Sequence, residues 1–562
     1  MQTKFISKLK YEDIFDEANS VEQLATKISK DDALVLLSAI NSKISFILSK
    51  PGLERHFILN EWLKFSDKGI KYKIKKAYEK YYKRKNDGDI DLSSVIILNK
   101  VTTLRVIEII LINNNFINKK VDTKTASESL FRLYLLVGSE ITNRQDKAFK
   151  MFLPTYGDKG KRIRLHLFMG LTYVEPANYI SRSQVFVSQF LKFIQFEKWL
   201  RNKKEFTNLT KDYLKQIGVK SWSDYFNDVF QINSLSIQHI FISHESNPVL
   251  KNTLDYLSSN VDNKTEWNEF LAVKKNPLYK VNESKYLVLD FDFLIEKFFT
   301  SVYHDLVHLS KEQNLLVFHS DYNKEFIEEY LLNKAIENVF GKSYVKFTEI
   351  KMKSLKPKKS NVGLPDYYIR NGNKVLIFEC KNSYISHDLI KNLDLKLLED
   401  DIKNKFYINT NKRKKAVKQL IDSIRNSANG NYSFFDASAK HEKLMYYPIL
   451  IITDPLLRSM GFNQLMNEYL DLEKEMIDSY IRKSILPVTV LHIDDLLFYD
   501  KDLKHLDRLI KDYHKYLSNK EYIGEMISFS VYLSTIKFPS YKRLNEKQIN
   551  EFVKDSFISE QK

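Results

Sequence analysis

The stretch GLPDYYIRNGNKVLIFECKN, from Gly363 to Asn382, contains two apolar runs separated by a turn signal. Its segments DYYIR and KVLIFECKN are rich in aromatic and branched aliphatic residues, which predicts two strands. The dipeptide Asn371-Gly372 between them favours a two-residue hairpin turn. Glu379 and Lys381 interrupt the second apolar run, so a predicted buried strand includes two charged side chains.

Two registers of this hairpin are open from the sequence. With Asn371-Gly372 as the turn, Asp366 lies opposite Ile377; with Gly372-Asn373 as the turn, it lies opposite Glu379. Residues paired across two strands share a face of the sheet, and so do alternate residues along one strand. Both registers therefore give the same assignment of side chains to faces.

That assignment places the charged side chains of Asp366, Glu379 and Lys381 on one face. A three-residue turn would move Asp366 to the other face, so the inference depends on the two-residue turn. Five apolar or aromatic side chains of the hairpin point the other way, toward a predicted core: Tyr367, Ile369, Leu376, Phe378 and Cys380.

Two carboxylates at the end of a hairpin form an oxygen-rich site suited to Mg²⁺, and the backbone carbonyl of Cys380 can add a ligand. A bound ion lowers the pKa of a coordinated water and offsets charge that develops on a phosphodiester. Lys381 can orient that water or stabilise the developing charge. Asp366, Glu379 and Lys381 are thus the set that phosphodiester hydrolysis requires. The alternative is a structural ion pair between Glu379 and Lys381, because buried charges need partners.

The segments around the hairpin predict a mixed sheet covered by helices. An amphipathic helix is expected over residues 323–341, a strand over 344–350 and a lysine-rich loop over 351–361. Helical stretches follow the hairpin, and KLMYYPILIITDP at 443–455 is expected to be another buried strand. The apolar run ILPVTVL at 485–491 can extend the sheet. The order helix, three strands, helix, strand implies strands of mixed direction.

Pro365-Asp366, twelve intervening residues and Glu379-Cys380-Lys381 resemble the motif of the PD-(D/E)xK nuclease superfamily. The order of elements over residues 323–455 is similar to that superfamily's αβββαβ core, which is restriction-endonuclease-like. The resemblance implies that Asp366 and Glu379 hold Mg²⁺, for which Mn²⁺ can substitute, and that Lys381 assists catalysis.

The resemblance also implies further site residues. The first helix of the core often contributes another acidic residue, for which Glu329 is our choice and Glu328 the alternative. In one subgroup the later helix has a Gln followed four residues on by Tyr. Here Gln419 is followed by Ser423. Gln419 is therefore an additional candidate, and the chain departs from that subgroup.

The formal net charge of +17 favours a polyanionic partner, because Lys and Arg bind phosphates with release of counterions. A general enrichment in Lys, Asn and Ile is the alternative explanation. Basic residues on both sides of the motif are the expected phosphate contacts, with solvated charge runs as the competing interpretation. These residues are Lys356, Lys358, Lys359, Lys412, Arg413 and Lys415.

A chain of 562 residues is long enough for two to four domains. We expect an α/β, overall α+β, protein with a largely helical N-terminal region. The expected boundaries are a helical domain at 1–115, a mixed, mainly helical middle region of unassigned fold at 116–280, a nuclease-like domain at 281–500 and a helical region at 501–562.

The sequence predicts a cytoplasmic protein. Its single cysteine, Cys380, excludes an internal disulfide framework. The first residues lack the apolar core of a signal peptide, and no apolar run approaches the ~18 residues that span a bilayer. We therefore expect no membrane association.

Together these features predict a Mg²⁺-dependent DNA endonuclease of a bacterial defence or restriction system. A homodimer would suit double-strand cutting, and a partner protein in a defence complex is the other expected assembly. Two alternatives stay open: a non-catalytic nucleic-acid-binding or scaffold protein with a degenerate nuclease fold, and an RNA-cleaving effector.

Overall fold

The structure is a computed structural model that describes residues 7–49, 52–85, 95–117, 121–172, 182–258, 270–341, 343–519 and 525–537. The chain forms two compact units, each discontinuous in sequence. The sheet unit combines Met151–Thr207 with Ser310–Lys562, and the helical unit combines Gln2–Lys150 with Asn208–Leu309. The units run across the boundaries expected at residues 115, 280 and 500.

The helical unit contains the helical N-terminal region that the sequence predicts. Side-chain caps define several helix starts: the side chain of Asn99 accepts a hydrogen bond from the N–H of Thr102, and that of Ser221 accepts one from the N–H of Asp224. The main helices of this unit are α2 (Lys30–Ser49), α4 (Lys68–Lys85), α5 (Lys100–Ile112), α6 (Thr123–Phe152), α9 (Thr207–Ile217), α10 (Trp222–Gln238) and α14 (Thr300–Glu312). α6, α9 and α14 each extend slightly past the division between units.

Short strands in the helical unit form two small sheets. β1 (Ser7–Lys8) pairs in parallel with β2 (Val95–Ile96). The second sheet is antiparallel in the order β3-β5-β4, with strands Phe241–Ser243, Lys285–Val288 and Leu278–Lys280. Shorter helices complete the unit: α1 (Val21–Ala25), α3 (Leu53–Phe57), α11 (Lys251–Leu257), α12 (Leu271–Lys275) and α13 (Phe291–Glu296).

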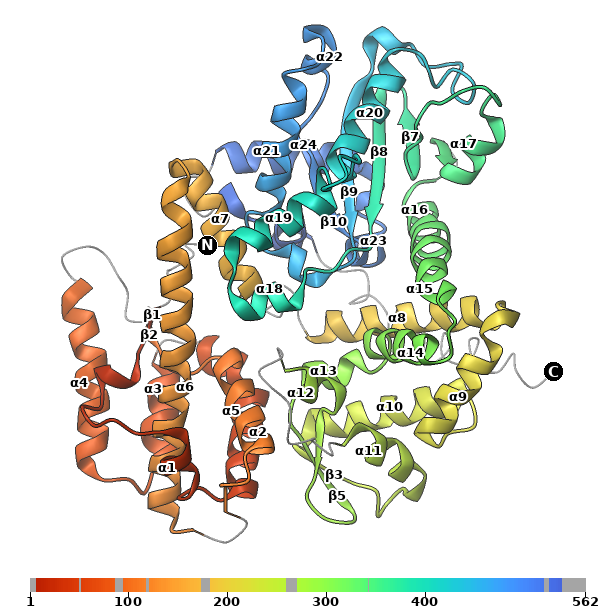
Figure 1. Cartoon of the computed structure of the whole chain (residues 1–562). Helices are drawn as coiled ribbons and strands as arrows, with labels where there is room; N and C mark the ends of the chain where they lie inside the picture. The colour runs from red at the N-terminus through yellow and green to blue at the C-terminus, as the bar shows by residue number, and fades with distance from the viewer. Residues whose placement is uncertain are drawn as a thin grey trace. The chain divides into compact units, whose positions relative to one another are not determined.

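The sheet unit is built on a five-stranded mixed sheet in the order β10-β9-β8-β7-β6 (Figure 1). β6, β7 and β8 pair antiparallel in succession, whereas β8, β9 and β10 pair in parallel. The mixed sheet expected in the C-terminal half is thereby confirmed, and β10 confirms that the run at 485–491 extends it. The strands are β6 (Val345–Thr348), β7 (Tyr367–Asn371), β8 (Lys374–Lys381), β9 (Met445–Ile452) and β10 (Thr489–His492).

The hairpin between β7 and β8 adopts the second of the two expected registers. Asn371 pairs with Lys374, which leaves Gly372 and Asn373 as the two-residue turn. The turn position that the Asn371-Gly372 dipeptide favours is therefore not the one that forms. The physical reason is that Gly372 takes the positive φ of 60°, as the first central residue of a type II′ turn requires, and Asn371 stays in the ladder.

Helices cover both faces of this sheet. The amphipathic helix α20 (Ala416–Ala428) packs on β8 and β9, and its buried face includes Leu420 and Ile424. On the other face, the Phe340 ring meets the Phe378 ring edge to face, with centroids 6.4 Å apart. Every β8 residue from 375 to 380 is buried, so the strand is covered on both sides.

The expected helix at 323–341 is present as two consecutive helical segments with different winding. Residues Tyr322–Leu332 form the π-helix η8, and Asn333–Val339 form α16. α15 (Val317–Asp321) leads into η8. In a π-helix each N–H bonds to the carbonyl five residues back rather than four.

The lysine-rich loop expected from residue 351 is partly wrong, because residues Glu349–Leu355 form the helix α17. The side chain of Thr348 caps it by accepting a hydrogen bond from the N–H of Lys351 at 3.2 Å. The strand expected to reach residue 350 therefore ends at Thr348.

Additional helices complete the sheet unit: α7 (Asp158–Thr172), α8 (Arg182–Arg201), α18 (His387–Asn392), α19 (Leu395–Phe406), α21 (Phe462–Lys474), α22 (Ser479–Lys483), α23 (Ile493–Phe498), α24 (Leu506–Ser518) and α25 (Phe529–Ile536). The helical C-terminal region expected at 501–562 is seen as α24 and α25, and residues 520–524 and 538–562 lie outside the described part. Within the described ranges, no helix has both the length and the apolar character needed to cross a membrane.

Candidate active site

The hairpin places the three charged residues of the motif at one edge of the sheet. Tyr367 and Phe378 form the last pair of the ladder, and the next step brings Asp366 opposite Glu379. Asp366 Oδ2 accepts a hydrogen bond from the N–H of Cys380 at 2.6 Å. Asp366 therefore uses Oδ2 to bond to the backbone at the end of the ladder, and its Oδ1 atom takes no part in that hydrogen bond.

Glu379 and Lys381 contact each other directly. Lys381 Nζ lies 2.7 Å from Glu379 Oε1, and only 2% of Glu379 is exposed. Cys380 points to the opposite face, where its side chain is fully buried. The structure thus brings together Asp366, Glu379 and Lys381, with the backbone of Cys380 between the two carboxylates.

The electrostatics of the site are dominated by an excess of carboxylates. Burial raises the pKa of Glu379 to about 8, helped by the nearby carboxylates of Asp366 and Glu328 and opposed by Lys381. Burial also raises the pKa of Asp366, again against the effect of Lys381. Burial alone would lower the pKa of Lys381, but the charges of Glu379 and Asp366 outweigh it and the pKa is raised. Lys381 therefore stays protonated.

The π-helix η8 brings a further carboxylate to this cluster. Burial and the charge of Asp366 raise the pKa of the half-buried Glu328 to about 7, while Lys381 acts in the opposite direction. Glu328, the alternative in the sequence analysis, therefore lies within the field of the motif residues. Glu329 is also half-buried, and its backbone carbonyl accepts a hydrogen bond from Asn333 Nδ2 at 2.6 Å.

Glu349, which the sequence analysis missed, begins α17 beside the site. Its N–H donates to the carbonyl of Asp366 at 3.0 Å, and its charge helps to raise the pKa of Asp366 and of Glu328. Its own carboxylate pairs with Lys353 at 2.7 Å. The pairing of Thr348 with Tyr367 places it next to Asp366, a relation that needs the register of β6 and is not visible in the sequence.

Gln419 lies on α20, the helix that packs on β8 and β9. The residue is half-buried, and its Oε1 atom is buried without a hydrogen-bond partner in the described structure. Within the described residues, no hydrogen bond or ion pair joins Gln419 to Asp366, Glu379 or Lys381, so Gln419 is a candidate only by its position on the covering helix.

The basic residues expected to contact phosphates fall into two classes. Lys356 Nζ donates to the carbonyl of Val362 at 2.6 Å, so this residue is engaged within its own loop. The others are exposed or, for Lys415, half-exposed: Lys358, Lys359, Lys412, Arg413 and Lys415. Their neighbours Lys414 and Lys418 instead form ion pairs with Asp422 at 2.5 Å and Glu473 at 3.0 Å.

The donor atoms at the site fit a hard divalent cation with an incomplete protein shell. Asp366 and Glu379 supply carboxylate oxygens, and Cys380 can supply its carbonyl. Mg²⁺ commonly takes one or two carboxylates and keeps several waters. No group of three or more His, Cys, Asp or Glu side chains within the described ranges is arranged to hold a metal ion. An ion here would therefore depend on water or substrate oxygens.

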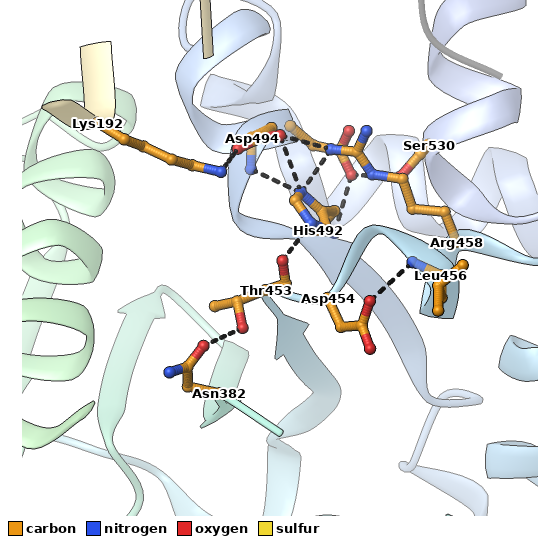
Figure 2. A network of polar contacts seen from close by, with 10 residues as sticks. Lys192, Asn382, Thr453, Asp454, Leu456, Arg458, His492, Asp494 and Ser530 are labelled. Atoms are coloured by element: carbon orange, nitrogen blue, oxygen red, sulfur yellow. Dashed lines mark hydrogen bonds and ion pairs between the residues drawn. The ribbon is translucent and has the colours of Figure 1, made fainter. Parts of the chain in front are cut away.

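A second polar cluster lies where the parallel strands β9 and β10 end, and Figure 2 shows it around the imidazole of His492. His492 Nε2 lies 2.9 Å from the carbonyl of Thr453, so we assign the proton to that nitrogen. Nδ1 then accepts from the N–H of Asp494 at 3.1 Å and from Arg458. Burial and the charge of Arg458 hold the pKa of His492 well below its usual range.

Asp494 is the anion of this second cluster. Lys192 Nζ lies 2.5 Å from Asp494 Oδ1, and Arg458 Nη2 lies 3.1 Å from Asp494 Oδ2. Burial opposes ionisation, but Lys192 and Arg458 outweigh it and the pKa of Asp494 is lowered. Asp495 beside it accepts hydrogen bonds from the N–H of His492 and the hydroxyl of Ser530.

Comparisons of the chain with models of protein families, with curated proteins and with solved structures find no match.

Proposed function

We propose that the chain is a metal-dependent nuclease that hydrolyses phosphodiester bonds in DNA, as part of a bacterial defence or restriction system. The observation that supports the chemistry is the meeting of Asp366, Glu379 and Lys381 at one edge of the sheet, where carboxylates outnumber cations. The choice of DNA and the defence role rest on the resemblance of the motif to that of restriction enzymes.

Each residue has a distinct role in this proposal. Asp366 and Glu379 would hold Mg²⁺, which when bound lowers the pKa of a coordinated water and offsets negative charge on the phosphodiester. Lys381 keeps its proton, so it stabilises charge on the phosphate oxygens and is not a base. Glu328 has a pKa of about 7 and can accept the proton of the attacking water near neutral pH.

A non-catalytic nucleic-acid-binding or scaffold protein is the second candidate. The ion pair of 2.7 Å between Glu379 and Lys381 supports it, because that pair already gives each buried charge a partner. In that case the exposed lysines would bind nucleic acid, and the motif would only stabilise the sheet edge.

Cleavage assays separate these functions. The substrates are plasmid DNA, single-stranded DNA and RNA, each with Mg²⁺, Mn²⁺ or EDTA. We expect metal-dependent cleavage that falls roughly 10²- to 10⁴-fold in Asp366→Asn, Glu379→Gln and Lys381→Met. Lys346→Met is the matched control, because Lys346 forms an ion pair with Glu337 elsewhere on the same sheet unit.

Each outcome has a clear meaning. Preference for RNA over both DNA substrates would identify an RNA-cleaving effector. Binding of nucleic acid without cleavage, equal in wild type and Glu379→Gln, would support the scaffold. Cleavage that all three site variants retain would contradict the assignment of the site.

A further inference from the structure

The winding of the π-helix η8 determines which of its side chains lie on the same side. Asn323 and Glu328 are five residues apart. In an α-helix, residues five apart lie about 140° from each other around the axis. A π-helix hydrogen bond joins residues five apart, so the two residues lie about one turn apart on the same side. The winding of η8 therefore places Asn323 and Glu328 on a common side.

Asn323 contacts the strand that contains the motif. Asn382, the residue directly after Lys381, donates a hydrogen bond from Nδ2 to Asn323 Oδ1. Asn323 Nδ2 in turn lies 3.1 Å from His319 Nε2, in the preceding helix α15. A direct polar contact thus joins the first turn of η8 to the end of β8.

The other end of the Asn382 amide is fixed by the neighbouring strand. The hydroxyl of Thr453, which follows β9, donates to Asn382 Oδ1. The carbonyl of Thr453 accepts from His492 Nε2 at 2.9 Å, and Figure 2 shows this chain continuing to Asp494 and Lys192. Since Oδ1 accepts from Thr453 and Nδ2 donates to Asn323, the amide has a defined orientation with both ends used.

We propose that Asn382 is a positioning residue, which fixes η8 to the end of β8 through Asn323 so that Glu328 faces Asp366 and Glu379. This inference rests on the proposed function of the same site. A carboxylate on a separate helix can serve the site only if that helix is held in register with the strand. Asn382 fixes the position of η8 relative to β8, because it bonds to Asn323 of η8 and directly follows Lys381.

The test compares Asn382→Leu with a matched control. The leucine has a similar volume and removes both hydrogen bonds. Asn467→Leu is the control, because Asn467 bonds to the carbonyls of Asn463 and Val488 at 2.9 Å and to the N–H of Val488 at 2.8 Å, in the same unit. Asn467 belongs to α21 and is no part of the candidate site. Asn323→Leu is a second variant that removes the bridge from the helix side.

Hydrogen exchange of metal-free protein is the first measurement. We expect faster exchange in the peptide covering residues 322–332 for Asn382→Leu and Asn323→Leu, and wild-type exchange there for Asn467→Leu. The effect of the double variant at 323 and 382 should be smaller than the sum of the two single effects, because both single variants remove the hydrogen bond between Asn323 and Asn382. Unchanged exchange in η8, or an equal increase in the Asn467 control, would contradict the claim that the hydrogen bond between Asn382 and Asn323 holds η8 in place.

Mn²⁺ affinity and DNA cleavage of the same proteins test what the bridge does. We expect about tenfold weaker Mn²⁺ binding and a roughly 10- to 100-fold lower kcat at unchanged KM in Asn382→Leu, as for other residues that orient ligands. Wild-type kcat and affinity in that variant would overturn the positioning role. If wild type neither binds Mn²⁺ nor cleaves, the proposed function fails, while the exchange data still decide whether the bridge holds η8.

Discussion

Two charged clusters lie at the carboxyl ends of parallel strands of the five-stranded sheet, and they differ in charge balance. At the end of β8, the carboxylates of Asp366, Glu379, Glu328 and Glu349 outnumber the ammonium groups of Lys381 and Lys353, and the pKa of Glu379 is raised to about 8. At the end of β10, Asp494 lies between Lys192 and Arg458, and its pKa is lowered.

The difference separates a site with more carboxylates than cations from one in which the two are equal in number. In the Asp494 cluster, Lys192 and Arg458 are the cations for the carboxylates of Asp494 and Asp495, and both nitrogens of the neutral His492 have partners. The Glu379 cluster holds protons at neutral pH because burial, together with the mutual repulsion of its carboxylates, raises the pKa values of Glu379 and Glu328 against the effect of Lys381. Such perturbed groups gather at functional sites, and a divalent cation would supply the missing charge.

The largest expected effect is on the stability of the complete cluster. Asp494→Ala would leave Lys192 and Arg458 buried without their anion. We expect the free energy of unfolding to fall by roughly 3–5 kcal/mol, measured by urea denaturation. The control Asp512→Ala breaks an exposed contact with Arg508 of 3.9 Å and should change it by at most about 0.5 kcal/mol. A loss below about 1 kcal/mol for Asp494→Ala would remove the contrast between the clusters.

An intermediate effect concerns the pH dependence of stability in the carboxylate-rich cluster. Because the folded state raises the pKa of Glu379 to about 8, it binds that proton more tightly than the unfolded chain does. The resulting stabilisation is present below the ordinary Glu pKa and is lost as the pH rises through about 8. Glu379→Gln has no such proton to lose.

The stability of Glu379→Gln relative to wild type should therefore increase between pH 5 and pH 9. We expect a change of roughly 2 kcal/mol, less than the full shift of the pKa implies because Asp366, Glu328 and Lys381 titrate together with Glu379. Urea denaturation across that pH range measures it. A difference that is flat with pH, or that decreases, would show that the cluster is not short of positive charge.

The smallest expected effect concerns the exposed basic residues. Lys412→Ala and Arg413→Ala should each reduce the slope of log affinity against log salt for DNA by about 1, without change in sequence preference. Lys414→Ala should have a smaller effect, because Lys414 is paired with Asp422. Filter binding at several salt concentrations measures the slopes. If the slopes of all three variants equal that of wild type, these residues do not contact the nucleic acid.

The sequence predicted the structure well where the alternation of side chains along a strand and the residues of a turn determine which side chains share a face. Alternation along DYYIR and KVLIFECKN predicted the face shared by Asp366, Glu379 and Lys381, and both possible registers agreed on it. The choice between registers was not predictable, since Gly372 can occupy either central position of a two-residue turn. A loop was predicted for the lysine-rich segment after β6 because of its charge. Thr348, whose side chain caps the start of α17, was not recognised as a helix N-cap.

Other features depend on long-range contacts and leave no local pattern. The cluster around Asp494 joins Lys192, Arg458 and His492 from three separate parts of the chain. η8 is wound as a π-helix, and such changes in helical winding are not encoded in apolar spacing. Buried polar partners of this kind follow from the packing of the whole unit.

The most direct test of the account is a calorimetric titration of wild type, Glu379→Gln and Asp454→Asn with Mn²⁺ at pH 7. Asp454 is a carboxylate beyond β9 whose oxygens accept from the N–H groups of Ile385 and Leu456, so it is the matched control. The account predicts Mn²⁺ binding with proton release in wild type and Asp454→Asn, and at least tenfold weaker binding in Glu379→Gln. Equal affinity in all three proteins, or no binding by wild type, would contradict the claim that the Glu379 cluster is a cation site.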